Sequence, residues 1–422
     1  PGTEHAEGGA EWGMTAHQDL RNPLSLFTPR RHVNGLYNLA EVALRIVAAP
    51  ALLLALAGPA LPLNQSSPAP VRGGAVTSFE DVSARATRAR EAGRLEQASS
   101  LYREAVALRP GWAEGWWFLG SMAYERDRHE ECREAFERLL ELEPQIGPAW
   151  ALRGLCEFSL GRYGPAEQHL AKAREVGPVA DEPMWWVVVY HQALLDLRAG
   201  EFEQALRPLR QLASRLGSAP EVQEACGLRL LRRALLPADI PAESRDFVRA
   251  VGQAECASLA GRRAEAEESF RALLTQYPRE RHLHYGLGLL LAQGGQAEAV
   301  EAFRREVELH PDHVLAQVEL AFNLLKLGRA GEAVAAAEAA VRLDPEVFVT
   351  HLALGRALVA SGDLALGTFE LESAARLGPG SPDVFFALAR AYRAAGRPDD
   401  ADRANTRFLE LDKARRGAGT PE

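Results

Sequence analysis

This sequence lacks an excess of positive charge, and that lack argues against one large class of function. The 422 residues carry 48 Lys and Arg against 57 Asp and Glu, which gives a formal net charge of −9. A nucleic-acid-binding face normally shows as a basic excess, so we expect no nucleic-acid partner. Lysine is especially rare and occurs only as Lys172, Lys326 and Lys413. We interpret the dominance of arginine as the codon bias of a GC-rich, bacterial genome.

Cysteine is also rare. The four cysteines are separated by 24, 70 and 30 residues, and no two have the close spacing of a zinc or redox site. The plainest interpretation makes Cys132, Cys156, Cys226 and Cys256 small buried helix residues. A disulfide formed in an oxidising compartment is the alternative.

Catalytic motifs are missing. The sequence contains no phosphate-binding glycine loop and no HExxH, GxSxG or CxxC motif. On a helix His282 and His284 would point to different sides, and His310 and His313 flank a proline. We interpret these histidines as solvated or packing residues. The sequence therefore predicts no catalytic residue, no metal and no cofactor, and we expect that the protein is not an enzyme.

Residues 1–78 differ in composition from the rest of the chain. An uncharged apolar run at 46–63 contains Ala55-Leu56-Ala57, which has the small-x-small form of a signal-peptidase site. The run is too short and too rich in proline for a comfortable membrane span. We interpret 1–78 as a leader that holds an export signal and then a linker rich in Pro, Ser and Gly. An uncleaved membrane anchor and a disordered leader are the alternatives.

A period of about 34 residues runs through the remainder of the chain. Similar phrases that end in proline recur, such as YREAVALRP, FERLLELEP, FRREVELHP and AEAAVRLDP. Before each phrase comes a turn with a glycine and a small residue, as in Gly93 with Ala98. An apolar helical stretch precedes the turn, and in three repeats it carries the pair Leu-Gly, as in Leu119-Gly120.

This pattern resembles the tetratricopeptide repeat, in which Trp, Leu-Gly, Ala, aromatic residues and Pro hold fixed places in 34 residues. The resemblance covers roughly 79–415. It implies an all-α solenoid, a right-handed superhelix of helix-turn-helix repeats that bury their apolar faces against one another. It also implies that small residues at the eighth and twentieth places let the two helices of a hairpin approach. A bulky residue at the twenty-fourth place, such as Phe136, would then fill the space towards the next repeat.

The repeats begin near residues 79, 113, 147, 186, 247, 280, 314, 348 and 382. In the one that begins near 280, a residue is missing between the two helices. The run Met184–Tyr190 could be a strand, but its helical context favours a first helix. We divide the array into three repeats at 79–180, a degenerate repeat and distorted joint at 181–246, five repeats at 247–415 and a disordered tail at 416–422.

The resemblance further implies that the first helices of the repeats line a concave groove. Places 2, 5, 9 and 12 form a stripe on one face of each first helix, because they are spaced 3, 4 and 3 residues apart. Aromatic residues and arginine are frequent binding anchors. The stripe therefore predicts an aromatic and apolar groove with arginines towards its C-terminal end, formed by Trp117, Tyr124, Phe158, His282, Tyr285, Leu289, Phe322, Leu325, Arg356, Phe386, Arg390 and Arg393.

These features predict a non-catalytic scaffold or adaptor that binds protein or peptide partners with an acidic portion. We expect it to be exported, to the periplasm or outside the cell, with contact to a membrane only if the N-terminal segment stays as an anchor. One alternative is an accessory subunit of a cell-envelope assembly, secretion or polysaccharide-export machine. A remote alternative is an enzyme with a site near 220–246.

Overall fold

The computed structural model describes residues 78–177 and 183–417. These residues form α-helices, one 3-10 helix and connecting turns, with no β-strand, so the predicted all-α fold is confirmed for them. The signal-like run at 46–63 lies outside the described residues. None of the helices within the described ranges is long and apolar enough to span a membrane. The chain divides into two compact units, residues 1–208 and 209–422.

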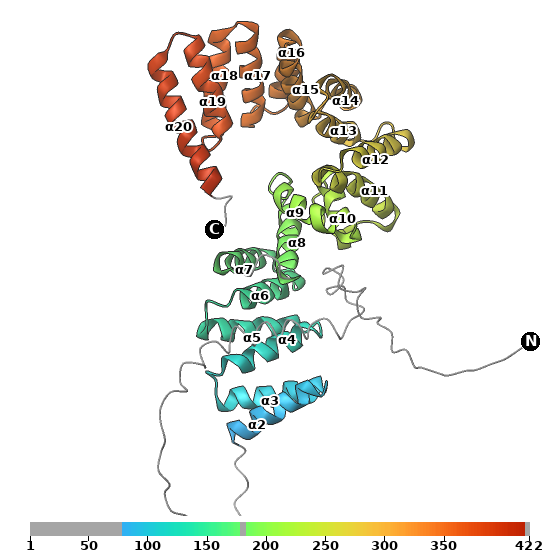
Figure 1. Ribbon diagram of the computed structural model, residues 1–422, viewed down its shortest axis with the longest axis vertical. Coiled ribbons are helices and arrows are strands. Elements are labelled where there is room, and N and C mark those ends of the chain that lie inside the picture. Colours follow the sequence, from blue (N-terminus) through green and yellow to red (C-terminus); the bar gives the residue numbers. More distant parts are fainter. Residues whose placement is uncertain (1–77, 178–182, 418–422) are drawn as a thin grey trace, which may run out of the picture. The chain divides into compact units, whose positions relative to one another are not determined.

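The first unit contains three consecutive helical hairpins and one further helix (Figure 1). The further helix, α8, contains the run Met184–Tyr190, so its helical interpretation is confirmed. The helices are α2 (Phe79–Glu91), α3 (Leu95–Leu108), α4 (Ala113–Tyr124), α5 (His129–Leu142), α6 (Gly147–Ser159), α7 (Tyr163–Val176) and α8 (Pro183–Arg198).

The second unit contains α10 to α20, and α9 crosses the division between the units. α20 continues to Gly417, so Arg416 and Gly417 are helical, whereas the sequence assigned them to a disordered tail. The elements are α9 (Leu206–Leu216), α10 (Pro220–Leu230), the 3-10 helix η4 (Pro237–Asp239), α11 (Ala242–Leu259), α12 (Arg263–Gln276), α13 (Leu283–Leu291), α14 (Gln296–Leu309), α15 (Val314–Lys326), α16 (Ala330–Leu343), α17 (Phe348–Ser361), α18 (Leu364–Leu377), α19 (Pro382–Ala394) and α20 (Pro398–Gly417).

Several hairpins are held by a bulky side chain against a glycine. A methyl group on Gly120 would lie 2.6 Å from the ring of Phe136, and one on Gly288 would lie 2.6 Å from the ring of Phe303. Both phenylalanines are fully buried. The residue at the twenty-fourth place thus lies over the glycine of its own hairpin, whereas the sequence assigned it only to the space towards the next repeat. It reaches the next repeat as well, because Phe270 of α12 would clash with a methyl group on Gly286 of α13.

Successive repeats are joined by a side chain in the first turn of each first helix. The indole nitrogens of Trp116 and Trp150 donate to the carbonyls of Pro110 and Pro144, both at 2.8 Å. His351 holds the corresponding place and lies 2.9 Å from the carbonyl oxygen of Pro345. These bonds give a partner to the proline carbonyls, which lie in the turn just after the preceding helix. The recurrent prolines therefore end one helix and also supply an acceptor for the next.

The repeat near 280 has an unusual turn before its first helix. Most hairpins have a residue with positive φ between their helices, such as Gly261 (φ 76°) and Gly328 (φ 72°). In this repeat the glycine at the turn, Gly295, has φ −141°, and the positive φ falls instead on His282 (φ 74°), just before α13. α13 has only 9 residues. The repeat from which the sequence lacks one residue is therefore also the repeat whose backbone departs from the others, both before α13 and in the turn between α13 and α14.

In the distorted joint, α10 and α11 both correspond to the first helix of a repeat, and they pack on each other. The second helix that would normally lie between them is absent. After α10 the chain runs through η4 and then enters α11, which packs directly on α10. Two glycines permit the contact, because a methyl group on Gly227 would overlap the carbonyl oxygen of Val248 and one on Gly252 that of Gln223. Pro237 and Pro241 stand where the second helix would have continued, which is the reason for its loss.

All four cysteines are buried in pairs. Cys132 of α5 and Cys156 of α6 form a disulfide with a Cα–Cα distance of 6.4 Å, so the alternative in which a disulfide forms is correct for this pair. Cys226 of α10 and Cys256 of α11 are free thiols with sulfur atoms 2.8 Å apart. Burial raises the pKa of Cys226 well above its ordinary value, which keeps the thiol protonated.

We predict that Gly252→Ala destabilises the second unit by about 3 kcal/mol or more, because the added methyl group would force α10 and α11 apart. Urea unfolding followed by circular dichroism measures the change. Gly331→Ala is the matched control, since Gly331 lies in α16 and a methyl group added there would meet no atom within 4 Å. That control should be neutral or more stable by up to about 1 kcal/mol. Equal effects of the two substitutions would contradict the close helix contact.

Candidate functional site

The predicted stripe in the second unit lies on three first helices that contact one another in sequence, α15, α17 and α19. The guanidinium carbon of Arg356 stands 5.0 Å from the ring centroid of Phe322, and that of Arg390 stands 5.9 Å from the ring centroid of Phe386. Phe386 is 47% exposed, and its ring also lies 5.4 Å from that of Phe408. The structure thus brings aromatic and cationic groups together on adjacent helices.

The arginines of this stripe are not neutralised. Arg356, Arg390 and Arg393 are exposed and form no ion pair with any residue in the described part of the chain. Elsewhere arginines are commonly paired, as Arg329 is with Glu332 at 2.6 Å. Burial of its guanidinium lowers the pKa of Arg356, the charge of Arg390 lowers it further, and Asp383 opposes the shift. Two like charges close enough to act on each other would be stabilised by an anionic ligand.

In the first unit the stripe is more covered. Trp117 is only 4% exposed and packs edge-on against Phe136 with ring centroids 5.6 Å apart, so it belongs to the core rather than to a groove. Tyr124 is half-buried, and burial raises the pKa of its hydroxyl. Phe158 is half-buried between Tyr163 and His191, at centroid distances of 5.4 and 4.8 Å. This part of the stripe offers a partner little aromatic surface.

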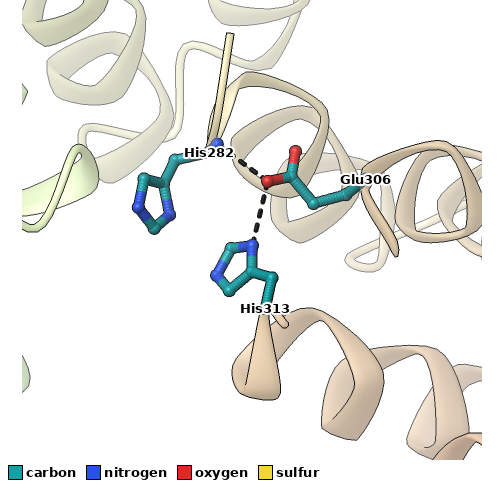
Figure 2. A group of neighbouring side chains, drawn as sticks. All are labelled: His282, Glu306 and His313. Carbon is teal, nitrogen blue, oxygen red and sulfur yellow. Dashed lines mark hydrogen bonds and ion pairs between the residues drawn. The ribbon is translucent and has the colours of Figure 1, made fainter. Parts of the chain in front are cut away.

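Two further stripe residues, His282 and Tyr285, belong to a buried cluster in the second unit. His282 is 8% exposed, so it is not available as a groove residue. Tyr285 is half-buried, and its ring centroid lies 4.9 Å from that of His313. The structure adds Glu306 of α14, which is fully buried and lies next to both histidines (Figure 2).

The sequence did not indicate this cluster of His282, Glu306 and His313. The signal that it did contain is that both histidines stand in the turn before a first helix, about one repeat apart. Glu306 gives no signal, because it is one of many helical carboxylates. Burial raises the pKa of Glu306, but hydrogen bonds from His313 and from backbone N–H groups outweigh it and lower the pKa overall. Burial lowers the pKa of His282 to about 3, and the neighbouring His313 contributes.

Charged groups in the distorted joint serve to hold its backbone. Glu224 of α10 accepts from Arg245 at 2.9 Å and from Arg249 at 2.7 Å. Arg245 also donates to the carbonyls of Pro237 and Ile240 at 2.9 and 3.2 Å, which fixes the segment between α10 and α11. Arg229 and Glu255 form a second, buried ion pair. The remote alternative of an enzyme near 220–246 gains no support from groups that are occupied in this way.

The fold and the site together define a helical-repeat protein whose hairpins stack through glycine–aromatic contacts. A family model described as tetratricopeptide repeat matches residues 83–144, 132–181, 260–313, 289–348 and 318–382, which together make up more than half of the chain. The chain belongs to the tetratricopeptide-repeat family. Members of this family are protein–protein interaction scaffolds. The unmatched stretch between 181 and 260 contains α8 to α11 and the distorted joint.

Solved structures with a similar fold include several of MamA. The MamA 41-end structure from Desulfovibrio magneticus RS-1 is 22% identical, covers 38% of this chain and 92% of its own, and has a TM-score of 0.35. Another MamA crystal structure is 18% identical, covers 39% and 96%, and has a TM-score of 0.35. These similarities concern the helical fold over part of the chain. No curated protein gives a significant match.

We predict that the first unit loses stability on mild acidification because of His191. Burial lowers the pKa of this imidazole to about 4, although its hydrogen bond to the carbonyl of Val187 acts in the opposite direction. The folded pKa lies below the unfolded value of about 6.5, so the unfolded chain binds more protons between these values. The stabilising contribution is complete above pH 6.5 and is lost as the pH falls towards 4.

Urea unfolding followed by tryptophan fluorescence measures this loss, since all the described tryptophans lie in the first unit. We expect the free energy of unfolding to fall by about 2 kcal/mol between pH 7 and pH 5 through His191. In His191→Gln this part of the pH dependence should disappear, because glutamine does not titrate. An unchanged pH dependence in that variant would show that His191 is protonated equally in both states.

Proposed function

We propose that the protein is an exported, non-catalytic adaptor that binds a protein or peptide with an acidic portion along α15, α17 and α19. The observation that carries the proposal is the set of unpaired arginines Arg356, Arg390 and Arg393 beside the exposed ring of Phe386. Apolar side chains of a partner would pack on the rings of Phe322 and Phe386. Its carboxylates would form ion pairs with guanidinium groups that have none within the described chain.

This binding surface is local to the C-terminal end of the array. Trp117 and His282 are buried, so the anchors that remain accessible are those on the last three first helices. Arginine and aromatic residues carry much of the binding energy at protein interfaces, especially at the centre of the contact. The partner segment is therefore short, amphipathic and acidic, rather than a chain that follows the whole array.

Export is supported by the disulfide as well as by the leader. Protein disulfides form and persist in oxidising compartments and are rare in the reducing cytosol. The Cys132–Cys156 bond joins α5 to α6 at a repeat junction and closes a loop of 24 residues. A bond across such a junction suits a chain that folds after export.

Displayed peptide libraries test the proposed binding. We expect selected peptides to be enriched in Asp and Glu next to apolar residues, and to bind about 10-fold more weakly to Arg390→Ala and to Phe386→Ala. Added salt should weaken binding further. Phe369→Ala is the matched control, since Phe369 is 56% exposed but lies on α18. Peptides without acidic residues, or equal losses in all three variants, would refute the assignment.

Fractionation of native cells tests export. We expect the chain in the periplasmic or secreted fraction, cleaved after Ala57, with the Cys132–Cys156 bond intact in peptide mass spectra taken without reductant. Alkylation before lysis traps thiols and prevents later oxidation. A cytoplasmic chain with Cys132 and Cys156 both alkylated would contradict the localisation and leave the binding surface untouched.

A further inference from the structure

Three polar side chains from different segments meet in the interior of the second unit. His282 precedes α13, Glu306 lies on α14 and His313 precedes α15. Figure 2 shows the carboxylate of Glu306 directed towards the backbone nitrogen of His282 and the ring of His313, with the ring of His282 to one side. His282, Glu306 and His313 are 8%, 0% and 3% exposed. One donor atom from each residue lies within 4.8 Å of the others, and the two imidazole centroids are 4.5 Å apart. Such polar groups are costly to bury unless they share a common partner.

Glu306 orients the cluster and is itself fully occupied. Its Oε1 accepts from the backbone N–H of His282 at 2.8 Å, and its Oε2 accepts from that of Tyr285 at 3.1 Å, so it caps α13. Oε1 also lies 2.9 Å from Nδ1 of His313. A carboxylate only accepts, so it fixes the proton of His313 on Nδ1 and leaves the Nε2 lone pair free to bind.

Each imidazole has a buried nitrogen that forms no hydrogen bond with any described residue. These atoms are Nδ1 of His282 and Nε2 of His313, and both are shielded from solvent. The ring of Tyr285 lies 4.9 Å from that of His313 and 6.5 Å from that of His282, and thus covers one side of the cluster. A buried ring nitrogen without a hydrogen-bond partner is costly, and a cation bound by both rings would give each of these nitrogens a partner.

The backbone at His282 has an unusual conformation for a residue other than glycine. Its φ of 74° lies in the left-handed region, which strains a residue other than glycine. Arg281, the nearest residue in sequence with a positive charge, is neutralised by Asp312, whose oxygens lie 2.8 and 2.9 Å away. Arg232 also acts on His282 as a positive charge. Glu306 is the negative charge within the cluster, and it would offset part of the charge of a bound cation.

We propose that Nδ1 of His282 and Nε2 of His313 bind one transition-metal ion of the nickel, copper or zinc class. Imidazole nitrogen suits these ions, and a carboxylate that bonds to the second nitrogen of a ligating histidine is the usual outer partner. Two nitrogens at about 2.0–2.1 Å from such an ion lie roughly 3.3 Å apart in a tetrahedral arrangement. The two imidazole centroids are 4.5 Å apart, a separation at which one nitrogen from each ring can bind the same ion. The ion would join the turns before α13 and α15, and thus fasten two consecutive repeats.

Calorimetric titration of the full chain tests the proposal. The chain must carry no polyhistidine tag and is first stripped with a chelator, and then Zn²⁺, Ni²⁺ and Cu²⁺ are added separately. We expect one equivalent to bind. His282→Asn, which tolerates the left-handed backbone, and His313→Gln, which can still donate to Glu306, should each weaken binding more than about 100-fold. His284→Gln and His310→Gln are matched controls from the same two turns and should bind normally.

Two further measurements keep the proposal testable if a variant fails to fold. The electron paramagnetic resonance spectrum of the Cu²⁺-loaded native chain should show two nitrogen donors. Metal should also raise the thermal midpoint of helix loss without moving the tryptophan-reported transition of the first unit. Absence of binding, binding retained in both ligand variants, or equal loss in the controls would overturn the site. None of these outcomes bears on the groove, because its arginines lie on other helices.

Discussion

The close approach of two helices within each hairpin is the constraint on which the rest of the structure depends. Gly120 and Gly288 leave room for the rings of Phe136 and Phe303, and a methyl group at either glycine would collide with a ring that is fully buried. A single hairpin cannot bury such a ring on both sides, so the next repeat must cover it. Stability in this chain is therefore built from one interface after another, and each interface needs both the small and the large residue in register.

The two irregular parts of the second unit are local solutions to the same constraint. In the joint, a second helix is lost at Pro237 and Pro241, and Gly227 with Gly252 let α10 and α11 replace it by direct contact. In the repeat near 280, the altered backbone at His282 shortens α13, and Glu306 caps the displaced helix start. Both irregularities bring charged or polar groups into the interior, where they must be paired. The joint pairs its groups with one another, whereas the cluster of His282, Glu306 and His313 leaves two buried nitrogens without a hydrogen-bond partner.

The position of a residue within the repeat decides whether its side chain is packed or exposed on the surface. Side chains between adjacent helices are buried by packing. Only residues that point away from both adjacent helices can contact a partner. On α15, α17 and α19 these places hold Phe322, Arg356, Phe386 and Arg390, and the charge of Arg390 acts on Arg356. In the first unit the same places hold larger rings that neighbouring helices cover, as with Trp117. A uniform stripe in the sequence thus becomes an exposed surface of arginine and aromatic side chains on the last three first helices only.

The sequence by itself determined the repeat family, the helical fold and the positions of most hairpins, because the period of 34 residues records which residues must be small, large or helix-ending. It also placed the arginines of α17 and α19 on one face, since that depends only on spacing along a helix. Tertiary structure alone decided the burial of Trp117 and His282, the pairing of Cys132 with Cys156, and the meeting of His282, Glu306 and His313. These depend on how far one repeat is rotated and shifted against the next. That geometry is set by the sum of many side-chain contacts, and no single residue spacing records it.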